Sequence, residues 1–424
     1  MRKLLRNFME RFITKNRKKK KLPTKIAIVT NSSWYTHNFR LGLLRRLKEI
    51  GFEVHVIAPK DHFSSKLIAE GFTFTHLPLS IYSTNPLKEL NLIRSLIRIY
   101  RENNFDFVFH YTAKPNIYGS FAAWVTNVPS IAITTGLGVI RDRRTRISKS
   151  VLFFLYRIAS FLSKEVWFLN NDDLGLFLQK KVVSRSKAFL LPSEGVNIIE
   201  YQPDFDKDLS EKRSLKFLYA GRIVWSKGVK EFYEAALHFK NKGMKVEFSM
   251  LGFIVPEHPD AVSFNLVQQW HKDGVVEYLG ETEDIRPYLK GTDCLVLPSY
   301  FGEGVPRVLL EGASMAVPII TTDFVGCREV VDDGVNGFLC EVRNQHDLIK
   351  KIEIFLSMSR IDRFKMGMEG RKKVLREFDE EIIIGHYLNV LSKYIDLKGI
   401  RKRSKDSKGK DTFMGSEITN TKHS

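Results

Sequence analysis

The sequence predicts an α/β protein made of two Rossmann-like, doubly wound halves. Short apolar runs rich in β-branched residues alternate with amphipathic helical patterns from residue 25 onward. The alternation stops at a polar stretch over residues 201–213, the best linker candidate, and then starts again. At 424 residues the chain is long enough for two domains with separate cores.

The first half begins at Lys25 with KIAIVT, which has the short, nearly all-apolar character of a buried parallel strand. We expect a polar turn over residues 31–37 and a helix over residues 39–50. Further strands are predicted at EVHVIAP, FTHLPL, FDFVFHY, PSIAITTG, EVWFLN and KAFLLPS. This half should span residues 25–200.

The second half begins with the strand LKFLYAGR and a helix over residues 229–241. Its further strands are predicted at VEFSMLG, VVEYLG, DCLVLPS, PIITTD and GFLCEV. We expect this domain to span residues 214–375. A helical pattern that begins near Asp362 should continue into a terminal helix over residues 376–397, and residues 398–424 should be a disordered basic tail.

The net charge of +19 is concentrated at the two ends of the chain. Residues 1–21 hold ten Lys or Arg and one Glu, and residues 398–424 hold eight Lys or Arg and three acidic residues, which leaves +5 for the remainder. A nucleic-acid partner is therefore not expected. The chain has no run of eighteen apolar residues, no signal-peptide pattern, and three cysteines without a CxxC spacing, so we expect a cytoplasmic protein.

Two basic segments are candidates for contact with lipid. Residues 1–24 combine the amphipathic LLRNFMERFI with NRKKKKL, so the charges between Arg2 and Lys21 should attract an anionic membrane surface; the alternative is a solvated, disordered leader. The second cluster precedes VLFFLYRIASFL and would suit a polyprenyl diphosphate acceptor or the membrane, the alternative being a buried helix with a polar lead-in. It comprises Arg141, Arg143, Arg144, Arg146 and Lys149.

The segment SYFGEGVPRVLLEGASMAV carries the strongest functional signal. Glu303 lies in a glycine-rich loop after a strand, and Glu311 should lie on the helix that Pro306 begins as its first residue. The backbone N–H groups of Gly304 and Val305, with the positive end of the helix, suit a diphosphate. The alternative is that these carboxylates only stabilise the helix dipole, because this spacing also arises by chance.

Two cations are expected in the same crevice as Glu303. Gly221 and Arg222 end the strand LKFLYAGR, and Lys227 precedes the next helix. Ligands of open α/β sheets bind beyond the carboxyl ends of the strands, where these charges would neutralise a diphosphate leaving group. The alternative is that both are surface charges beside a loop.

The first half offers candidates at two strand ends. His110 ends FDFVFH and is expected to face the cleft as a catalytic group, the alternative being a hydrogen-bonded structural histidine. Lys114 and Asn116 follow it and are expected to contact the bound ligand. Gly136 and Gly138 in TTGLG should allow a ligand to approach the backbone.

The motifs together resemble a known family. The ordered series AGR, LG, YLG, LPSYFGEGVPRVLLEGASMAVPIITTD and GVNGFL resembles the C-terminal donor domain of glycosyltransferase family 4, retaining enzymes of the GT-B fold. The first half is similar through NFRLGLLRRLKEIGFEVHVIAP, TAKPNIYGSFAAW and ITTGLG, in the branch that acts on bacterial surface glycans and lipid-linked oligosaccharides. It departs from many members in having NSSWYTHN instead of a glycine-rich loop.

This resemblance implies two domains that face each other across a cleft. It also implies that Arg222 and Lys227 hold the donor diphosphate, that Glu303 contacts the sugar and that Glu311 contacts the ribose. Gly252 and the backbone around Leu279 would complete the donor site.

The expected activity is retaining transfer of a hexose or N-acetylhexosamine from a UDP-sugar to a polyprenyl-diphosphate-linked or other cell-surface glycan acceptor. The resemblance implies no metal and no cofactor beyond the nucleotide sugar. The enzyme should lie peripherally on the inner face of the cell membrane. The alternatives are a nucleotide-sugar 2-epimerase of the same fold and a catalytically silent membrane-associated scaffold.

Overall fold

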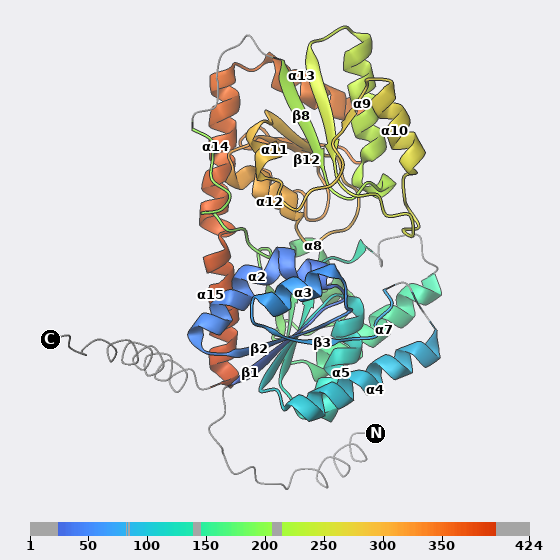
Figure 1. The fold of residues 1–424 in the computed structure, drawn as a ribbon, viewed down its shortest axis with the longest axis vertical. Helices are drawn as coiled ribbons and strands as arrows, with labels where there is room; N and C mark the ends of the chain where they lie inside the picture. Colours follow the sequence, from blue (N-terminus) through green and yellow to red (C-terminus); the bar gives the residue numbers. More distant parts are fainter. Residues whose placement is uncertain (1–23, 82, 84, 139–145, 206–213, 396–424) are drawn as a thin grey trace, which may run out of the picture.

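The computed structural model describes residues 24–81, 83, 85–138, 146–205 and 214–395, in which all thirteen predicted strands are present. They form two fully parallel sheets, one in each half of the molecule (Figure 1). The first has the order β3-β2-β1-β4-β5-β6-β7 and the second the order β10-β9-β8-β11-β12-β13. The prediction of two Rossmann-like halves is confirmed.

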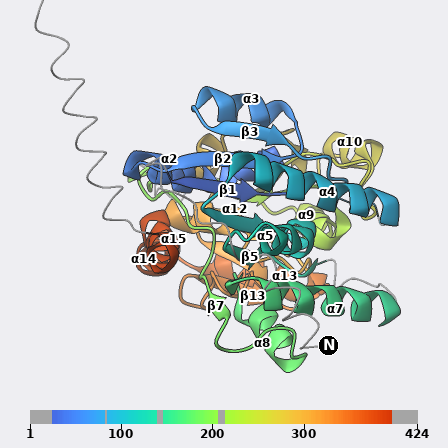
Figure 2. The ribbon, with the colours of Figure 1, turned by 90° about the horizontal axis from the view of Figure 1, so that it is seen from below.

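The strands of the first sheet are short and mostly buried on both faces, as their apolar sequences require. They are β1 (Lys25–Val29), β2 (Glu53–Ala58), β3 (Thr73–His76), β4 (Phe107–Tyr111), β5 (Ser130–Thr134), β6 (Glu165–Phe168) and β7 (Ala188–Leu190). The core on one face of this sheet is shared with α2 (Ser33–Ile50) and α3 (His62–Ala69). The opposite face packs against α4 (Pro86–Asn103), η1 (Pro115–Gly119), α5 (Ser120–Val125), α7 (Arg146–Leu162) and α8 (Asn171–Gln179) (Figure 2).

The second sheet has one continuous core made by residues from five of its six strands and the helices around them, and Tyr278 of the sixth strand packs against it. Its strands are β8 (Leu215–Ala220), β9 (Val246–Leu251), β10 (Glu277–Tyr278), β11 (Cys294–Leu297), β12 (Ile319–Thr322) and β13 (Gly337–Cys340). Its helices are η2 (Trp225–Lys227), α9 (Val229–Asn241), α10 (Phe264–Lys272), α11 (Arg286–Lys290), α12 (Arg307–Ser314), α13 (Gln345–Ser357) and α14 (Arg360–Glu377).

Two helix starts differ from the prediction. Helix α2 begins at Ser33, within the segment expected to be a turn, because its polar residues are satisfied internally: the hydroxyl of Ser33 donates to the carbonyl of Pro59 (2.7 Å), and Thr36 is paired with Thr30 (2.7 Å). Helix α12 begins at Arg307, and Pro306 is its extended N-cap residue (ψ 119°), not its first helical residue.

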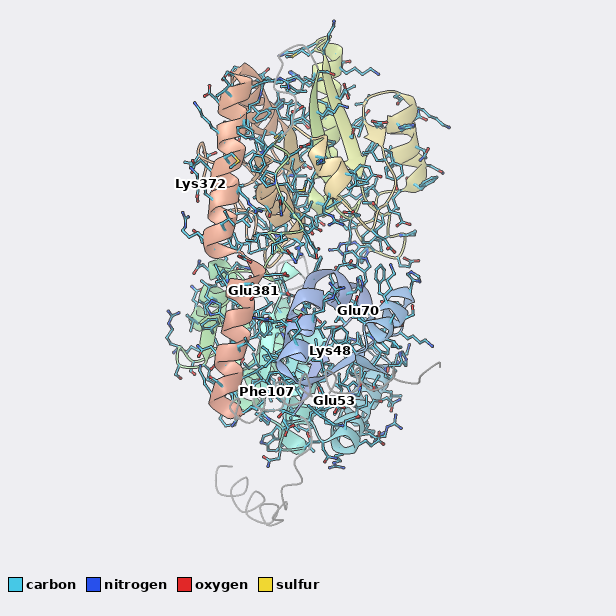
Figure 3. The ribbon with its side chains drawn as sticks, turned by 60° about the vertical axis from the view of Figure 1, so that its left-hand side comes forward. Lys48, Glu53, Glu70, Phe107, Lys372 and Glu381 are labelled. Carbon is cyan, nitrogen blue, oxygen red and sulfur yellow. The ribbon has the colours of Figure 1, made fainter. Side chains whose placement is uncertain are left out.

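The predicted terminal helical pattern is divided into two helices. Helix α14 packs on α12, whereas α15 (Glu380–Tyr394) returns to the first domain, where Tyr387 is buried in the core of the first sheet. The division lies at Phe378, whose carbonyl accepts the N–H of Val196 (2.9 Å). Figure 3 shows Lys372 on α14 beside the second domain and Glu381 on α15 beside the first. The chain therefore crosses between the domains at two adjacent places.

Several expectations fall outside the described residues. These are the leader up to Pro23, the basic tail over residues 398–424, and the side chains of Arg141, Arg143, Arg144 and Arg146. In the part of the chain that the structure describes, no helix has the length and apolar character needed to span a membrane.

Candidate functional site

The carboxyl ends of the two sheets face each other and are in direct contact. The N–H of Gly304, in the loop after β11, donates to the carbonyl of Thr135 after β5 (3.0 Å). The amide of Asn170, after β6, donates to the carbonyls of Glu303 (3.1 Å) and Gly304 (3.2 Å). The glycine-rich loop of the second domain is therefore held by the first domain.

Glycines make this contact possible. Gly136 has φ +124°, and a Cβ there would lie 2.7 Å from the backbone N of Gly304. A Cβ at Gly304 would lie 2.7 Å from Leu169 and 2.9 Å from the carbonyl of Thr135. Gly138 in the same way lies against the ring of Phe301. In this conformation the two glycines make room for the backbone and a ring of the opposite domain, so the expectation that Gly136 and Gly138 let a ligand approach stays a prediction.

Lys227 and Glu303 come together as an ion pair. Their side chains are only 8% and 18% exposed, so the pair lies in a largely closed space between the loops after β8 and β11. Burial, followed by the positive charge of Arg222, lowers the pKa of Lys227 to about 7. An anionic ligand beside the ammonium group would oppose this shift, because it stabilises the charged form of Lys227.

Arg222 is placed by tight packing of two strand ends. Gly221 has φ +153° and Gly252 has φ +152°, and a Cβ on Gly252 would overlap the carbonyl oxygen of Gly221. The hydroxyl of Tyr219 donates to the carbonyl of Arg222 (2.8 Å), and the Arg222 guanidinium lies 5.6 Å from the centre of the Phe301 ring. Arg222 therefore projects toward the loop that carries Glu303, as predicted.

Glu311 lies on α12 but has protein partners. Arg307 donates from Nε to Glu311 (3.1 Å) and from Nη1 to the carbonyl of Gly195 (2.6 Å), which belongs to the first crossing between the domains. The Tyr201 hydroxyl also hydrogen-bonds to Glu311. Burial raises the pKa of Glu311, and Arg307 acts in the opposite direction. No sequence pattern indicates this role of Arg307, because Gly195 is distant along the chain.

The remaining expected donor contacts are backbone groups with partners of their own. Leu279 N–H donates to the carbonyl of Met250 (2.9 Å), and Gly252 N–H donates to the carbonyl of Gly280 (2.8 Å). These bonds place both residues at the carboxyl edge of the second sheet. The Val305 side chain belongs to the core of the second domain, so it anchors the glycine-rich loop.

His110 does not face the cleft, which corrects the prediction. It is fully buried on the face of the sheet covered by α4, where the Tyr100 hydroxyl and His110 Nε2 share a hydrogen bond (2.9 Å). Burial lowers the pKa of His110 to about 3, so the ring is neutral. A Cβ on Gly119 would overlap the His110 ring, which closes the other side. The alternative of a hydrogen-bonded structural histidine is the one observed.

Lys114 and Asn116 are also occupied by structural contacts. Lys114 donates to the carbonyls of Ser80 and Ser83 (2.7 Å each) and pairs with Glu89 (2.5 Å). Asn116 is fully buried and bonds both the carbonyl (2.9 Å) and the N–H (3.2 Å) of Ile133. In this conformation neither side chain is available to a donor, and both position the loops of the first domain.

The aromatic rings at the start of α2 were not predicted as site residues. Trp34 lies edge-on to Phe253 of the second domain, with ring centroids 5.8 Å apart, and also contacts Phe63 at the start of α3 (6.5 Å). Lys66 pairs with Glu283 across the same side (2.6 Å). These contacts complete the closed arrangement, and only the fold brings their residues together.

The geometry agrees with comparisons to known proteins. Residues 200–373 match the family model of Glycosyl transferases group 1, and residues 25–165 match that of Glycosyl transferase 4-like proteins. The N,N'-diacetylbacillosaminyl-diphospho-undecaprenol alpha-1,3-N-acetylgalactosaminyltransferase of Campylobacter jejuni is 28% identical over 88% of this chain and 99% of its own length. The UDP-Gal:alpha-D-GlcNAc-diphosphoundecaprenol alpha-1,3-galactosyltransferase of Escherichia coli is 23% identical over 74% and 85%.

Solved structures share the fold. A glycosyltransferase from Rickettsia africae has a TM-score of 0.71 at 19% identity and covers 88% of this chain and 99% of its own. Alr3699/HepE from Anabaena, solved with UDP, has a TM-score of 0.70 at 18% identity and covers 87% and 100%.

Proposed function

This chain is a glycosyltransferase of the GT-B fold with Glycosyl transferase 4-like and Glycosyl transferases group 1 domains, and we propose that it transfers a sugar from a UDP-sugar to a polyprenyl-diphosphate-linked glycan acceptor. The observation that carries the proposal is the convergence of Arg222, Lys227 and Glu303 where the two sheets meet. Two cations and a carboxylate in a largely closed space suit a diphosphate joined to a sugar.

In the proposed mechanism the donor diphosphate replaces Glu303 as the partner of Lys227. The freed carboxylate of Glu303 then accepts hydrogen bonds from hydroxyls of the donor sugar, and Glu311 accepts from the ribose. Because Arg307 and Tyr201 already contact Glu311, ribose binding uses its remaining hydrogen-bonding capacity or displaces one of these groups. The N–H of Gly304 is engaged by Thr135 in this conformation, so its expected contact with the donor requires the domains to separate first.

We propose that transfer proceeds with retention. The bond from the sugar C1 to the diphosphate oxygen breaks, and the acceptor hydroxyl forms the new C1–O bond from the same face. The proton of that hydroxyl passes to the departing diphosphate oxygen, whose negative charge Arg222 and Lys227 stabilise. This scheme requires no side-chain base, which agrees with the buried, neutral state of His110.

The proposed acceptor and location follow from the relatives. The names of the two relatives describe diphospho-undecaprenol substrates, which supports a lipid-linked acceptor here. The sugar moved would be a hexose or N-acetylhexosamine, and the enzyme would work peripherally on the cytoplasmic face of the membrane. The charges between Arg2 and Lys21 and between Arg141 and Lys149 remain candidates for contact with anionic lipid.

Transfer assays test this function. A panel of UDP-sugars is first screened for thermal stabilisation of the purified protein, because a ligand that binds only the folded state raises its melting temperature. The selected donor is then incubated with a polyprenyl-diphosphate-linked sugar, and the anomeric configuration of the product is read by NMR. We expect an α-linked product and release of UDP. Conversion of the donor without acceptor would instead indicate the epimerase, and absence of donor binding would indicate the scaffold.

Variants test the leaving-group assignment. Lys227→Ala and Arg222→Ala should each lower the transfer rate by about 10²–10³-fold, the usual cost of losing one preorganised group that stabilises developing charge. Lys230→Ala, an exposed lysine on α9, is the matched control and should keep full activity. Full activity in both site variants would remove Lys227 and Arg222 from the mechanism.

A further inference from the structure

Exposed apolar side chains of the first domain are concentrated on one face. Among the described residues from β1 to β7, ten large hydrophobic side chains are exposed; two of them, Ile68 and Ile81, lie elsewhere, and the other eight lie on α4, α5 and α7. The eight are Leu87, Leu90, Phe121, Trp124, Val151, Phe154, Ile158 and Phe161, which we call the apolar face. Exposed apolar side chains gathered in this way mark an interaction surface.

Helix α7 carries the centre of this face. Val151, Phe154, Ile158 and Phe161 are 54%, 61%, 40% and 79% exposed, and at 3.6 residues per turn they fall within an arc of about 80°. The opposite side of the helix, including Tyr156 and Ala159, is buried against β5 and β6. The alternative of a buried helix with a polar lead-in holds for one side of α7 only, because the helix has two apolar sides and only one of them has a partner among the described residues.

The three helices form one surface. Residues of α4, α5 and α7 pack on the same face of the first sheet, and α5 contacts both of the others (Figure 2). The hydroxyl of Ser120 at the start of α5 is hydrogen-bonded to that of Ser163 after α7 (2.9 Å), which brings the helices carrying Phe121 and Phe161 together. Figure 1 shows α4 and α5 at the end of the first domain away from the second domain, with α7 above them on the right-hand side.

The charges of this surface are almost all positive. Helix α7 contains no acidic residue and α5 contains no charged residue. The acidic residues of α4 are Glu102 and Glu89, and Glu89 is neutralised by Lys114 at 2.5 Å. Basic side chains with described positions on α4 and α7 are Lys88, Arg94, Arg98, Arg101, Lys149 and Arg157.

We propose that the apolar face, with its surrounding basic residues, docks on an anionic lipid bilayer and thereby orients the first domain toward the membrane. Apolar side chains enter the boundary between headgroups and acyl chains while basic side chains contact lipid phosphates. A second copy of this chain fits less well, because a two-fold contact would place basic residues against the same basic residues. The surface belongs to the folded first domain and contains no residue of the leader before Pro23.

A site-specific probe tests the proposal in the full-length chain. The three native cysteines are buried, so a cysteine introduced by Phe154→Cys or Phe161→Cys can be labelled selectively with an environment-sensitive fluorophore. Mixed phosphatidylglycerol and phosphatidylcholine vesicles should shift the emission of both labels to the blue, whereas pure phosphatidylcholine vesicles should not. The matched control is Phe264→Cys on α10, a position 56% exposed in the second domain, whose label should stay in water.

Other outcomes overturn the proposal. Sedimentation with anionic vesicles without a shift at either position would mean that another segment binds the lipid. A blue shift that needs no lipid and rises with protein concentration would indicate an interface between copies. Absence of both sedimentation and an emission shift would mean that the apolar face does not bind an anionic bilayer.

Charge and apolarity can be separated with a second set of variants. Phe154→Ser combined with Phe161→Ser, and Arg94→Glu combined with Arg98→Glu, should each weaken vesicle binding at least tenfold without lowering the melting temperature. Phe264→Ser should bind as the unaltered protein does. The proposed lipid-linked acceptor explains why the enzyme would dock on a membrane, and the inference rests on the proposed function in this respect alone. The vesicle assays contain neither donor nor acceptor, so a negative result in them is distinguishable from a negative result in the transferase assay.

Discussion

The ammonium group of Lys227 is in direct contact with the carboxylate of Glu303 in the closed arrangement of the two domains. The two residues lie on different loops of the second sheet, and both are mostly buried. The carboxylate therefore occupies the place that we propose for the donor diphosphate. Binding of a donor must exchange one anionic partner of Lys227 for another, and this exchange has measurable consequences.

The first consequence is proton uptake. The pKa of Lys227 is about 7 in the free protein, and a diphosphate beside it raises that pKa because it stabilises the charged form. Below pH 7 the lysine is already charged and donor affinity is insensitive to this group. Above pH 7 binding must take up a proton, so the Kd should rise up to about tenfold per pH unit until the pKa of the complex is reached.

Titration calorimetry in buffers of different ionisation enthalpy measures this uptake directly, with the UDP-sugar selected by the thermal screen. A donor esterified at both ends of its diphosphate does not titrate in this range, so the protein is the source of the signal. Lys227→Arg is the matched variant, because arginine stays charged throughout, and it should abolish the uptake. An unchanged proton stoichiometry in Lys227→Arg would contradict the assignment.

Arg307 should contribute substantially to the stability of the folded protein. Arg307→Gln removes the cation beside Glu311 and a donor to the Gly195 carbonyl, and leaves both groups in a mostly buried place. The free energy of unfolding should fall by about 2–4 kcal/mol, and the KM for the donor should rise because Glu311 loses its fixed position. Chemical denaturation measures the first quantity and steady-state kinetics the second.

The control for this variant is Arg376→Gln. Arg376 pairs with Glu377 on the exposed side of α14, where side-chain exposures of 67% and 36% predict a much smaller loss of stability than Arg307→Gln causes. Equal destabilisation by the two substitutions would mean that the contacts of Arg307 have no special weight.

Gly136→Ala should open the molecule. The new Cβ would meet the backbone of Gly304 at 2.7 Å, at a φ of +124° that alanine rarely adopts, so the contact between the domains must give way. We expect a larger radius of gyration by small-angle X-ray scattering and lower transfer activity, with the circular dichroism spectrum preserved. Gly175→Ala on α8 is the control, since no atom lies within 4 Å of the place that its Cβ would take. A radius unchanged by Gly136→Ala would argue that the closed contact does not form in solution.

His110 should contribute to stability and not to catalysis. Its pKa is about 3 in the folded protein, against an ordinary value of 6.5 for an exposed histidine, so between these limits the unfolded chain binds more protons. The contribution is complete above pH 6.5 and is lost as the pH falls toward 3. His110→Phe should remove this part of the pH dependence and destabilise the fold by about 1–3 kcal/mol, because the Tyr100 hydroxyl is left buried without this partner.

The shape of the pH–rate profile separates the two roles of His110. We expect kcat in the His110→Phe variant to follow the same pH dependence as in the unaltered enzyme. Loss of one limb of that profile in the variant would show that His110 titrates as part of the catalytic reaction. Tyr100→Phe serves as the partner variant, because it breaks the same hydrogen bond and leaves the imidazole in place.

The two-domain fold and one side of the proposed donor site follow from the amino-acid sequence alone. Buried parallel strands such as Lys25–Val29 are apolar on both faces, and this signal is local and strong. Arg222, Lys227 and Glu303 were predictable because each follows a predicted strand, and the carboxyl ends of parallel strands meet at one edge of the sheet.

What those residues contact depends on the folded chain. His110 was expected in the cleft from its place at a strand end, but which face of the sheet it occupies depends on the register with its neighbours, and it lies against Tyr100. Gly136 meets the opposite domain, and Arg307 reaches the crossing at Gly195, because folding brings distant segments into contact. The sequence VLFFLYRIASFL shows that α7 is apolar, whereas which of its sides is exposed depends on packing against the sheet, which a single sequence does not specify.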